Sequence, residues 1–255
     1  MRRIRLIVEY DGKNYSGWQR QLNAMSVQQK LEEALRKLTR EEELFVVGAS
    51  RTDAGVHAMG QNVHFDTQSR IPADKYCYAL NTLLPDDIRV RASMGVSNDF
   101  HARFSAKGKE YRYIFYNSPH ASAMMRNFSA HVMYPLDVDK MNAEAQTAVG
   151  THDFAPFAAS GSVVKDTVRT IDRVSITKNG EILEMRVHGN GFLYNMVRIL
   201  AGTLIGVGTG KLEPGAIEKA LSGGKRIDLG VTAPACGLTL MRVDYDAGTF
   251  SEEIK

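Results

Sequence analysis

Hydrophobic and polar residues alternate at the start of the chain, where Ile4, Leu6, Val8 and Tyr10 occupy every second position. A period of two predicts a strand with one buried face. Three further segments of the first hundred residues are also expected to be strands, and they cover residues 44–48, 61–66 and 88–96.

Helical spacing follows Ser26, which together with Gln29 matches a capping box. The apolar residues of this segment fall on one helical face: Leu31, Ala34, Leu35 and Leu38. A second helix is expected over about 73–84, where Pro85 ends it. The first half therefore has the element order βαβ followed by βαβ.

The same pattern resumes after a basic connector. Strands are expected over residues 110–117, 168–178, 181–188 and 238–243, and helices over 138–149, 193–207 and 214–221. The dipeptide Asn179-Gly180 predicts the tight turn of a hairpin. Asp137 is a suitable cap for the helix that follows it.

These elements predict an α+β protein made of two tandem ferredoxin-like (split βαβ) halves. The halves are expected to cover residues 1–105 and 106–255 and to form adjoining antiparallel sheets around a central basic cleft. The first half carries a loop with Asp53, and the second carries Tyr111 and Arg198.

Composition and charge narrow the class of protein. The chain has 255 residues, of which 44% are hydrophobic and 24% charged, as in globular proteins with a sizeable core. The net charge is only +3, so an anionic partner needs a local basic patch. Cys77 and Cys236 are isolated, which favours a reducing compartment. We expect a cytoplasmic protein without a secretory leader or a membrane span.

One ionised side chain, Arg198, interrupts the apolar stretch 192–208. A helix this apolar on every side is expected to be buried, and a buried guanidinium needs a partner for its donors. The sequence therefore predicts a carboxylate elsewhere in the fold, for which Asp53 is the candidate. Alternatively, the aliphatic stem of Arg198 carries its charge to the surface. Asn195 lies one turn earlier and is placed to serve the same cleft.

The candidate carboxylate lies in the loop ASRTDAGVHA, residues 49–58. Aspartate and glycine favour a simple turn. The loop also suits a reactive carboxylate, because a nucleophilic aspartate must be ionised, fixed and desolvated. An arginine opposite Asp53 would hold its pKa well below the ordinary value of about 3.9. Both interpretations stay open from the loop alone.

The connector FHARFSAKGKEYRY, residues 100–113, interleaves cationic and aromatic side chains. Cations bind phosphates and aromatic faces stack on unpaired bases, which favours an RNA-binding segment. The alternative is a solvated strand edge whose aromatic side chains face the core. Tyr111 and Tyr113 share one face of the expected strand, so Arg112 points the other way.

Several motifs together resemble one known family. The loop ASRTDAGVHA resembles the signature loop of the tRNA pseudouridine synthase A family, in which the aspartate is the nucleophile. Further matching motifs follow in the family's order along nearly the whole chain: YDG (10–12), GWQRQ (17–21), HARFSA (101–106), KEYRY (109–113), GTHDF (150–154), FLYNMVR (192–198) and APACGL (233–238). Ser50 and Ala58 stand where other members often carry glycine, but the stretch from Arg51 to His57 is intact.

The resemblance implies isomerisation of uridine to pseudouridine at positions 38, 39 and 40 of the tRNA anticodon stem-loop, with no cofactor and no metal. Asp53 would attack C6 of uracil or C1′ of the ribose, or abstract the C2′ proton. Arg198 would hold Asp53 ionised, and Tyr111 would stack on the flipped base. Arg51 would help expel that base or occupy its vacancy.

The resemblance also implies a homodimer in which one tRNA contacts both subunits. Four basic residues are candidates for phosphate contacts, which fix register without reading sequence: Arg20, Arg103, Lys107 and Lys109. Asn195 completes the expected substrate-binding set.

Two other classes of protein would use these residues differently. An RNA-binding protein or RNA chaperone without chemistry would share the connector but would not need Asp53 or Arg198. A phosphohydrolase with an aspartate nucleophile would call for Mg²⁺ and further acidic ligands, which the loop lacks.

Overall fold

The computed structural model describes residues 1–159 and 166–246, and it divides into two compact units. The first unit comprises Met1–Lys107 and the described residues from Leu240 onward, and the second comprises Gly108–Thr239. The chain returns to the first unit within its last strand, β10 (Leu238–Asp244). The division into halves at residue 105 stays a prediction about domains, and the expected second half includes residues that the structure groups with the first unit.

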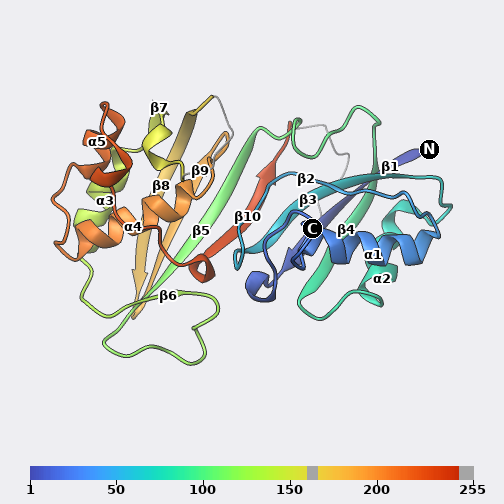
Figure 1. Cartoon of the computed structure of the whole chain (residues 1–255), viewed down its shortest axis with the longest axis horizontal. Coiled ribbons are helices and arrows are strands. Elements are labelled where there is room, and N and C mark those ends of the chain that lie inside the picture. The colour runs from blue at the N-terminus through green and yellow to red at the C-terminus, as the bar shows by residue number, and fades with distance from the viewer. Residues whose placement is uncertain (160–165, 247–255) are drawn as a thin grey trace. The chain divides into compact units, whose positions relative to one another are not determined.

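The first unit is built on an antiparallel sheet (Figure 1). β1 (Arg2–Tyr10) pairs on one side with β3 (His57–Thr67) and on the other with β4 (Ile88–Val96). The short β2 (Val47–Gly48) pairs with β3. The four side chains that alternate along β1 are all buried, so the period-two pattern is confirmed.

Two α-helices of this unit follow the helical spacing of the sequence. α1 (Val27–Thr39) begins after Ser26, whose hydroxyl accepts a hydrogen bond from the backbone N–H of Gln29 at 3.2 Å, so the predicted cap is confirmed. α2 (Tyr76–Asn81) packs against β4 and is shorter than the expected helix, because a 3₁₀ turn (Ala73–Lys75) precedes it.

The strand expected over 44–48 is wrong for its first three residues, which lie outside β2. Their backbone groups bond to side chains of α1 instead of to a neighbouring strand. The N–H of Val46 donates to Glu32 Oε1 at 3.2 Å, and Arg36 donates to the carbonyl of Leu44 at 2.9 Å. Leu44 and Val46 are buried, so packing beside the helix explains the apolar run.

In the second unit the sheet runs in the order β5-β9-β8-β7, and these neighbouring strands pair antiparallel. Its strands are β5 (Gly108–Asn117), β7 (Gly150–Asp153), β8 (Val168–Asn179) and β9 (Ile182–Gly189). β6 (Ala130–Val132) pairs in parallel with β5. The sequence pattern did not predict β6 or β7, which are too short to establish a period.

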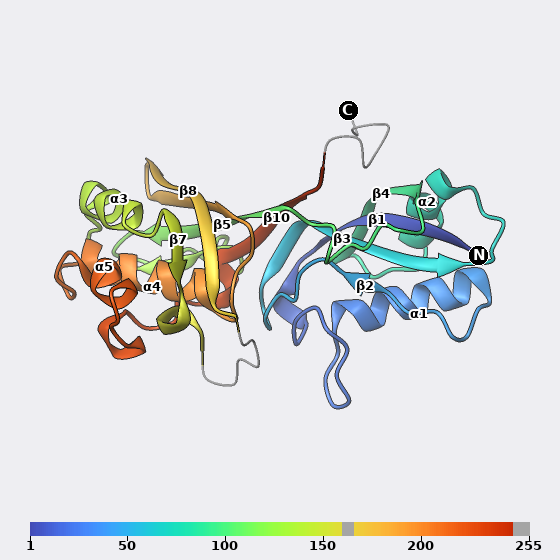
Figure 2. The ribbon, with the colours of Figure 1, turned by 90° about the horizontal axis from the view of Figure 1, so that it is seen from above.

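Helices cover one face of this second sheet in both views (Figures 1 and 2). They are α3 (Val138–Gln146), α4 (Met196–Gly208) and α5 (Ala216–Leu221), and α3 contacts β8 and both other helices. Asp137 caps α3 as expected, by accepting from the N–H of Lys140 at 3.0 Å.

The hairpin of the second unit is confirmed, but its turn lies one residue later than expected. Asn179 pairs with Ile182, so the two turn residues are Gly180 and Glu181. Four further 3₁₀ turns complete the secondary structure of the described ranges: Gly12–Asn14, Ala155–Phe157, Arg226–Asp228 and Ala235–Gly237.

The mixture of sheets and helices confirms the α+β class. The finer prediction, two ferredoxin-like halves around a basic cleft, stays a prediction. Across residues 1–159 and 166–246, helices fall short of the length and apolarity needed to cross a bilayer.

Candidate active site

Asp53 opens a tight turn in the first unit. The N–H of Val56 donates to the Asp53 carbonyl at 3.1 Å, and Gly55 within the turn has a φ of +77°. A β-turn with positive φ at its third residue favours glycine there, because a Cβ would be strained. The Asp53 side chain is half-buried. The loop is therefore a turn, as its composition suggested, and the turn also fixes the backbone that carries the carboxylate.

The segment from Tyr10 to Trp18 holds this turn in place. The N–H of Trp18 donates to the carbonyl of Thr52 at 3.0 Å, and the N–H of Gly55 donates to that of Tyr15 at 3.2 Å. The hydroxyls of Tyr10 and Thr52 lie 2.7 Å apart and share a hydrogen bond. The YDG and GWQRQ motifs thus support the Asp53 loop, and buried Trp18 anchors it.

Two further contacts fix the approach to Asp53. Gly17 has a φ of +89°, and a Cβ there would lie 2.6 Å from the Thr52 carbonyl, so only glycine fits this crossing. Before the turn, the side-chain amide of buried Gln61 bonds both to the N–H of Ser50 at 3.1 Å and to its carbonyl at 2.6 Å. Arg51, which follows, is exposed.

In the second unit, Tyr111 lies on β5 with its ring edge-to-face against Phe192, at 5.2 Å between centroids and 85° between planes. Tyr113 lies on the same face and is fully buried, and its hydroxyl donates to the Pro234 carbonyl at 2.7 Å. Burial raises the pKa of Tyr113, so its hydroxyl stays protonated at neutral pH. Tyr113 is therefore a core residue, whereas Tyr111 keeps 6% of its surface exposed.

Arg198 lies in the first turn of α4 and is half-buried. Its Nε donates to the carbonyl of Ala233 at 2.8 Å, and its Nη1 donates to Asn195 Oδ1 at 2.8 Å. The expected proximity of Asn195 and Arg198 is confirmed. Asn195 adopts a left-handed backbone, with φ of 62°, which makes the helix begin three residues later than predicted. These bonds fix the plane of the guanidinium.

The predicted ion pair joins Asp53 of the first unit with Arg198 of the second, and it stays a prediction. Each partner is nevertheless held by its own unit, Asp53 by a turn and Arg198 by two hydrogen bonds. The turn fixes the backbone that carries the Asp53 carboxylate, and the two hydrogen bonds fix the Arg198 guanidinium, as a catalytic role requires.

The four candidate phosphate contacts differ in their surroundings. Arg20 donates to the buried carboxylate of Glu32 at 3.1 Å, yet 46% of its side chain is exposed. Lys107 forms an exposed ion pair with Asp246 at 3.1 Å. Arg103 is exposed, and Lys109 is half-buried at the start of β5. Their contacts with RNA stay a prediction, and Glu32 gives Arg20 a structural role as well.

The two histidines near the Asp53 loop accept hydrogen bonds from the backbone. Nδ1 of His57 accepts from the N–H of Gly12 at 3.1 Å, and Nδ1 of His64 accepts from the N–H of Ala102 at 3.1 Å. Both rings are buried. The bond from Ala102 requires an unprotonated Nδ1 on His64, so His64 attaches the connector to β3 in its neutral form.

We expect the first unit to lose stability as pH falls from about 6.5 to about 4. Burial, helped by the positive charges of Arg3 and His101, lowers the pKa of His64 from 6.5 to about 4, while Asp66 opposes the shift. The unfolded chain therefore binds a proton at His64 that the folded chain excludes. The free energy of unfolding has its full value above pH 6.5, the pKa of His64 in the unfolded chain. It falls by about 3 kcal/mol between pH 6.5 and about pH 4.

Urea unfolding at several pH values measures this effect. His64→Asn is the comparison, because the asparagine oxygen can still accept from Ala102 but does not titrate. The variant should lose less stability than the wild-type chain on acidification. Equal losses in both proteins would contradict the role of His64.

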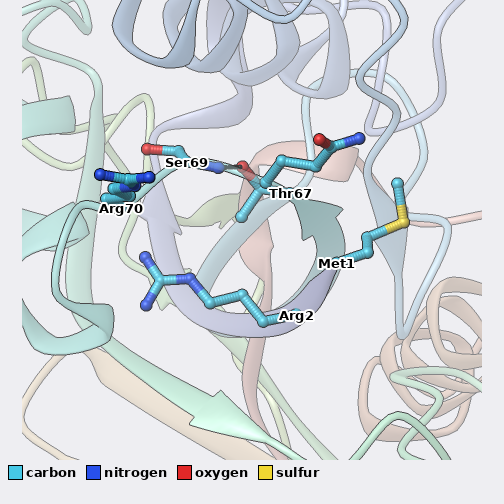
Figure 3. Close-up of a pocket in the computed structure, with 6 residues that line it drawn as sticks. Met1, Arg2, Thr67, Ser69 and Arg70 are labelled. Atoms are coloured by element: carbon cyan, nitrogen blue, oxygen red, sulfur yellow. Dashed lines mark hydrogen bonds between the residues drawn. The ribbon is translucent and has the colours of Figure 1, made fainter.

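A pocket of about 550 Å³ lies elsewhere in the first unit, between the start of β1 and the end of β3 (Figure 3). Arg2 and Arg70 both line it. None of the residues that the sequence singled out lines this pocket. It is therefore separate from the candidate site.

Comparison with known proteins shows which family the chain resembles. A model of the tRNA pseudouridine synthase family matches residues 6–105 and 145–246. A tRNA pseudouridine synthase A from Ruminiclostridium cellulolyticum is 54% identical over 96% of this chain and 100% of its own length. Those from Acetivibrio thermocellus and Bacillus subtilis are 50% and 45% identical, each over 96% of this chain and 100% and 99% of their own lengths.

The chain belongs to the tRNA pseudouridine synthase family. It is thus an isomerase that acts on tRNA. The residues matched by the family model include Asp53, Asn195 and Arg198, whereas Tyr111 falls between the two matched segments.

Several supporting residues of this tRNA pseudouridine synthase were not singled out from the sequence. Gln61 and Thr52 hold the loop of Asp53, and Phe192 borders Tyr111. Thr52 belongs to the motif ASRTDAGVHA and Phe192 to FLYNMVR, so the family resemblance already pointed to both. Gln61 lies on β3 next to Asn62 and is fully buried. Because its neighbour on the strand is also polar, nothing in the sequence distinguished Gln61.

Proposed function

We propose that this chain converts uridine to pseudouridine at positions 38, 39 and 40 of the tRNA anticodon stem-loop, with Asp53 as the nucleophile. The observation that carries the proposal is the fixed turn at Asp53, supported from Tyr10, Tyr15 and Trp18. A nucleophile must be held in one geometry, and a carboxylate on a mobile loop would not be.

The reaction is an isomerisation, so every atom of uridine stays in the product. The bond from C1′ to N1 breaks, the base turns, and C1′ bonds to C5, while C5 loses a proton and N1 gains one. Asp53 attacks C6 or C1′, or removes the C2′ proton. Arg198 keeps that carboxylate ionised, and Tyr111 stacks on the everted base, whose removal from the helix costs a few kcal/mol.

The proposal includes the arrangement that such a substrate needs. Two ferredoxin-like halves enclose a basic cleft, and two copies of the chain form a cytoplasmic homodimer that shares one tRNA. Arg51 helps expel the base, and Asn195 lines its pocket. Arg20, Arg103, Lys107 and Lys109 bind phosphates, which fix the register of the RNA.

Release of tritium from tRNA made with [5-³H]uridine tests the reaction, with a chelator present throughout. We expect release from a transcript with uridine at 38, 39 and 40, and none when cytidine replaces all three. Binding without release would favour the alternative, an RNA-binding protein without chemistry. Release from the cytidine transcript would refute the proposed positions.

A further inference from the structure

The aromatic residues of the connector have different environments. Phe100, Tyr111 and Tyr113 are buried, with at most 6% of each exposed, whereas Phe104 is 76% exposed. The sequence could not tell which of the four rings are buried, and the structure buries three of them and leaves Phe104 at the surface.

Phe104 lies on a turn that is closed by hydrogen bonds. Nδ1 of His101 accepts from the N–H groups of Arg103 and Phe104, at 3.2 Å each. Ser105 returns to His101 twice, since its N–H donates to the His101 carbonyl at 2.9 Å and its Oγ accepts from the His101 N–H at 3.0 Å. The exposed ring is therefore displayed by an ordered backbone.

The ring of His101 packs against one face of the Phe104 ring. The imidazole of His101 stacks on Phe104 with 4.3 Å between centroids and 29° between planes. His64 in turn meets His101 edge-on at 4.8 Å. Burial and the charge of Arg3 lower the pKa of His101, which leaves its ring neutral at neutral pH. Phe104 thus has one ring face backed by protein.

Arg103 places a cation over part of the Phe104 ring, which stays 76% exposed. Its guanidinium carbon lies 5.6 Å from the Phe104 centroid, and the side chain is exposed. Within residues 1–159 and 166–246, no carboxylate forms an ion pair with it. A ring for a base and a cation for its phosphate together form the minimal unit that binds single-stranded nucleic acid.

Phe45 provides an instructive contrast in the same unit. It is 67% exposed, and Arg36 lies 5.6 Å from its centroid. However, Arg36 already donates to the Leu44 carbonyl at 2.9 Å and pairs with Glu32 at 3.5 Å. The Arg36 guanidinium is already bonded within the protein. Phe45 is therefore an exposed ring without a cation available for a phosphate.

We propose that Phe104, backed by His101 and flanked by Arg103, is a stacking platform for one unpaired nucleobase of the RNA substrate. The inference rests on the proposed function for the identity of the RNA. It is separate from the chemistry, because a platform binds any base through its π-face and takes no part in bond making.

Tryptophan fluorescence tests the platform directly. The chain has a single tryptophan, Trp18, which is buried, so Phe104→Trp adds one exposed reporter. We expect an unmodified tRNA transcript to quench the added emission, because stacked bases quench indole. Polyphosphate, which has charge but no bases, should not quench it, and Phe45→Trp should respond to neither. Absence of quenching by tRNA at saturation would overturn the proposal.

Affinity for the same transcript gives a second measurement. Loss of one stacked base should raise Kd by about 5-fold to 100-fold in Phe104→Ala. Phe104→Leu should lose as much, since it keeps apolar volume but has no ring, whereas Phe45→Ala should bind normally. Full affinity in Phe104→Leu would overturn the proposal.

Two outcomes separate this inference from others. If Phe104→Ala changes the oligomeric state in sedimentation, the ring is a contact between copies of the chain and the platform is refuted. If the wild-type chain releases no tritium but tRNA still quenches the Phe104→Trp reporter, the proposed reaction fails and the platform stands.

Discussion

Asp53→Asn is expected to abolish pseudouridine formation while leaving the fold and the tRNA affinity intact. A missing nucleophile removes the whole covalent route, so we expect turnover to fall by about 10⁴-fold or more. The turn itself should survive. Its hydrogen bond uses the backbone carbonyl of residue 53, and asparagine is favoured at that turn position.

Tritium release under single-turnover conditions measures the loss, and filter binding measures the retained affinity. Asp86→Asn is the matched control, because Asp86 is an exposed aspartate of the same unit whose partner is Arg89. It removes the same charge from the same unit. Turnover in Asp53→Asn within tenfold of the control would eliminate Asp53 as the nucleophile.

Arg198→Ala should lower kcat by at least about 100-fold with a smaller change in KM. In the proposed mechanism the Arg198 guanidinium orients a reacting group, so its loss would affect the transition state more than binding. Arg198→Lys should not restore activity. A lysine ammonium cannot reproduce the planar donors that reach Ala233 and Asn195 together.

A structural role must be separated from this catalytic one. Arg226→Ala is the matched control, because Arg226 also anchors this segment through the Gly230 carbonyl at 2.7 Å and the Thr232 hydroxyl at 3.3 Å. We expect added guanidinium ion to restore part of the activity of Arg198→Ala alone. Equal losses of activity and of unfolding free energy in both variants, without rescue, would mean that Arg198 only holds the loop.

Local chemistry let the sequence determine much of the secondary structure. The strand at the amino terminus, the cap at Ser26 and the hairpin near Asn179 depend on interactions between residues close in the chain. The turn at Asp53 belongs to the same class, because aspartate and glycine specify it over four residues. The resemblance of the motifs identified the family for the same reason, since motifs are local.

Other features were decided by contacts between distant residues. Residues 44–46 have a strand-like composition, but α1 offers side-chain partners to their backbone, and these bonds replace a ladder. Arg20 could have been free for phosphate, yet the buried carboxylate of Glu32 lies beside it. Neither outcome is visible from spacing, because each depends on which helix face meets which loop.

The connector, residues 100–113, shows most clearly what the sequence determines and what the tertiary structure decides. Its sequence specified the mixture of cations and rings, which is enough to favour RNA, but it did not specify exposure. Exposure follows from packing, which buries Phe100 and leaves Phe104 at the surface on a turn closed by His101. The amino-acid sequence therefore determined which chemical groups this enzyme has, and the tertiary structure decided which of them face solvent, because burial is a property of the assembled core.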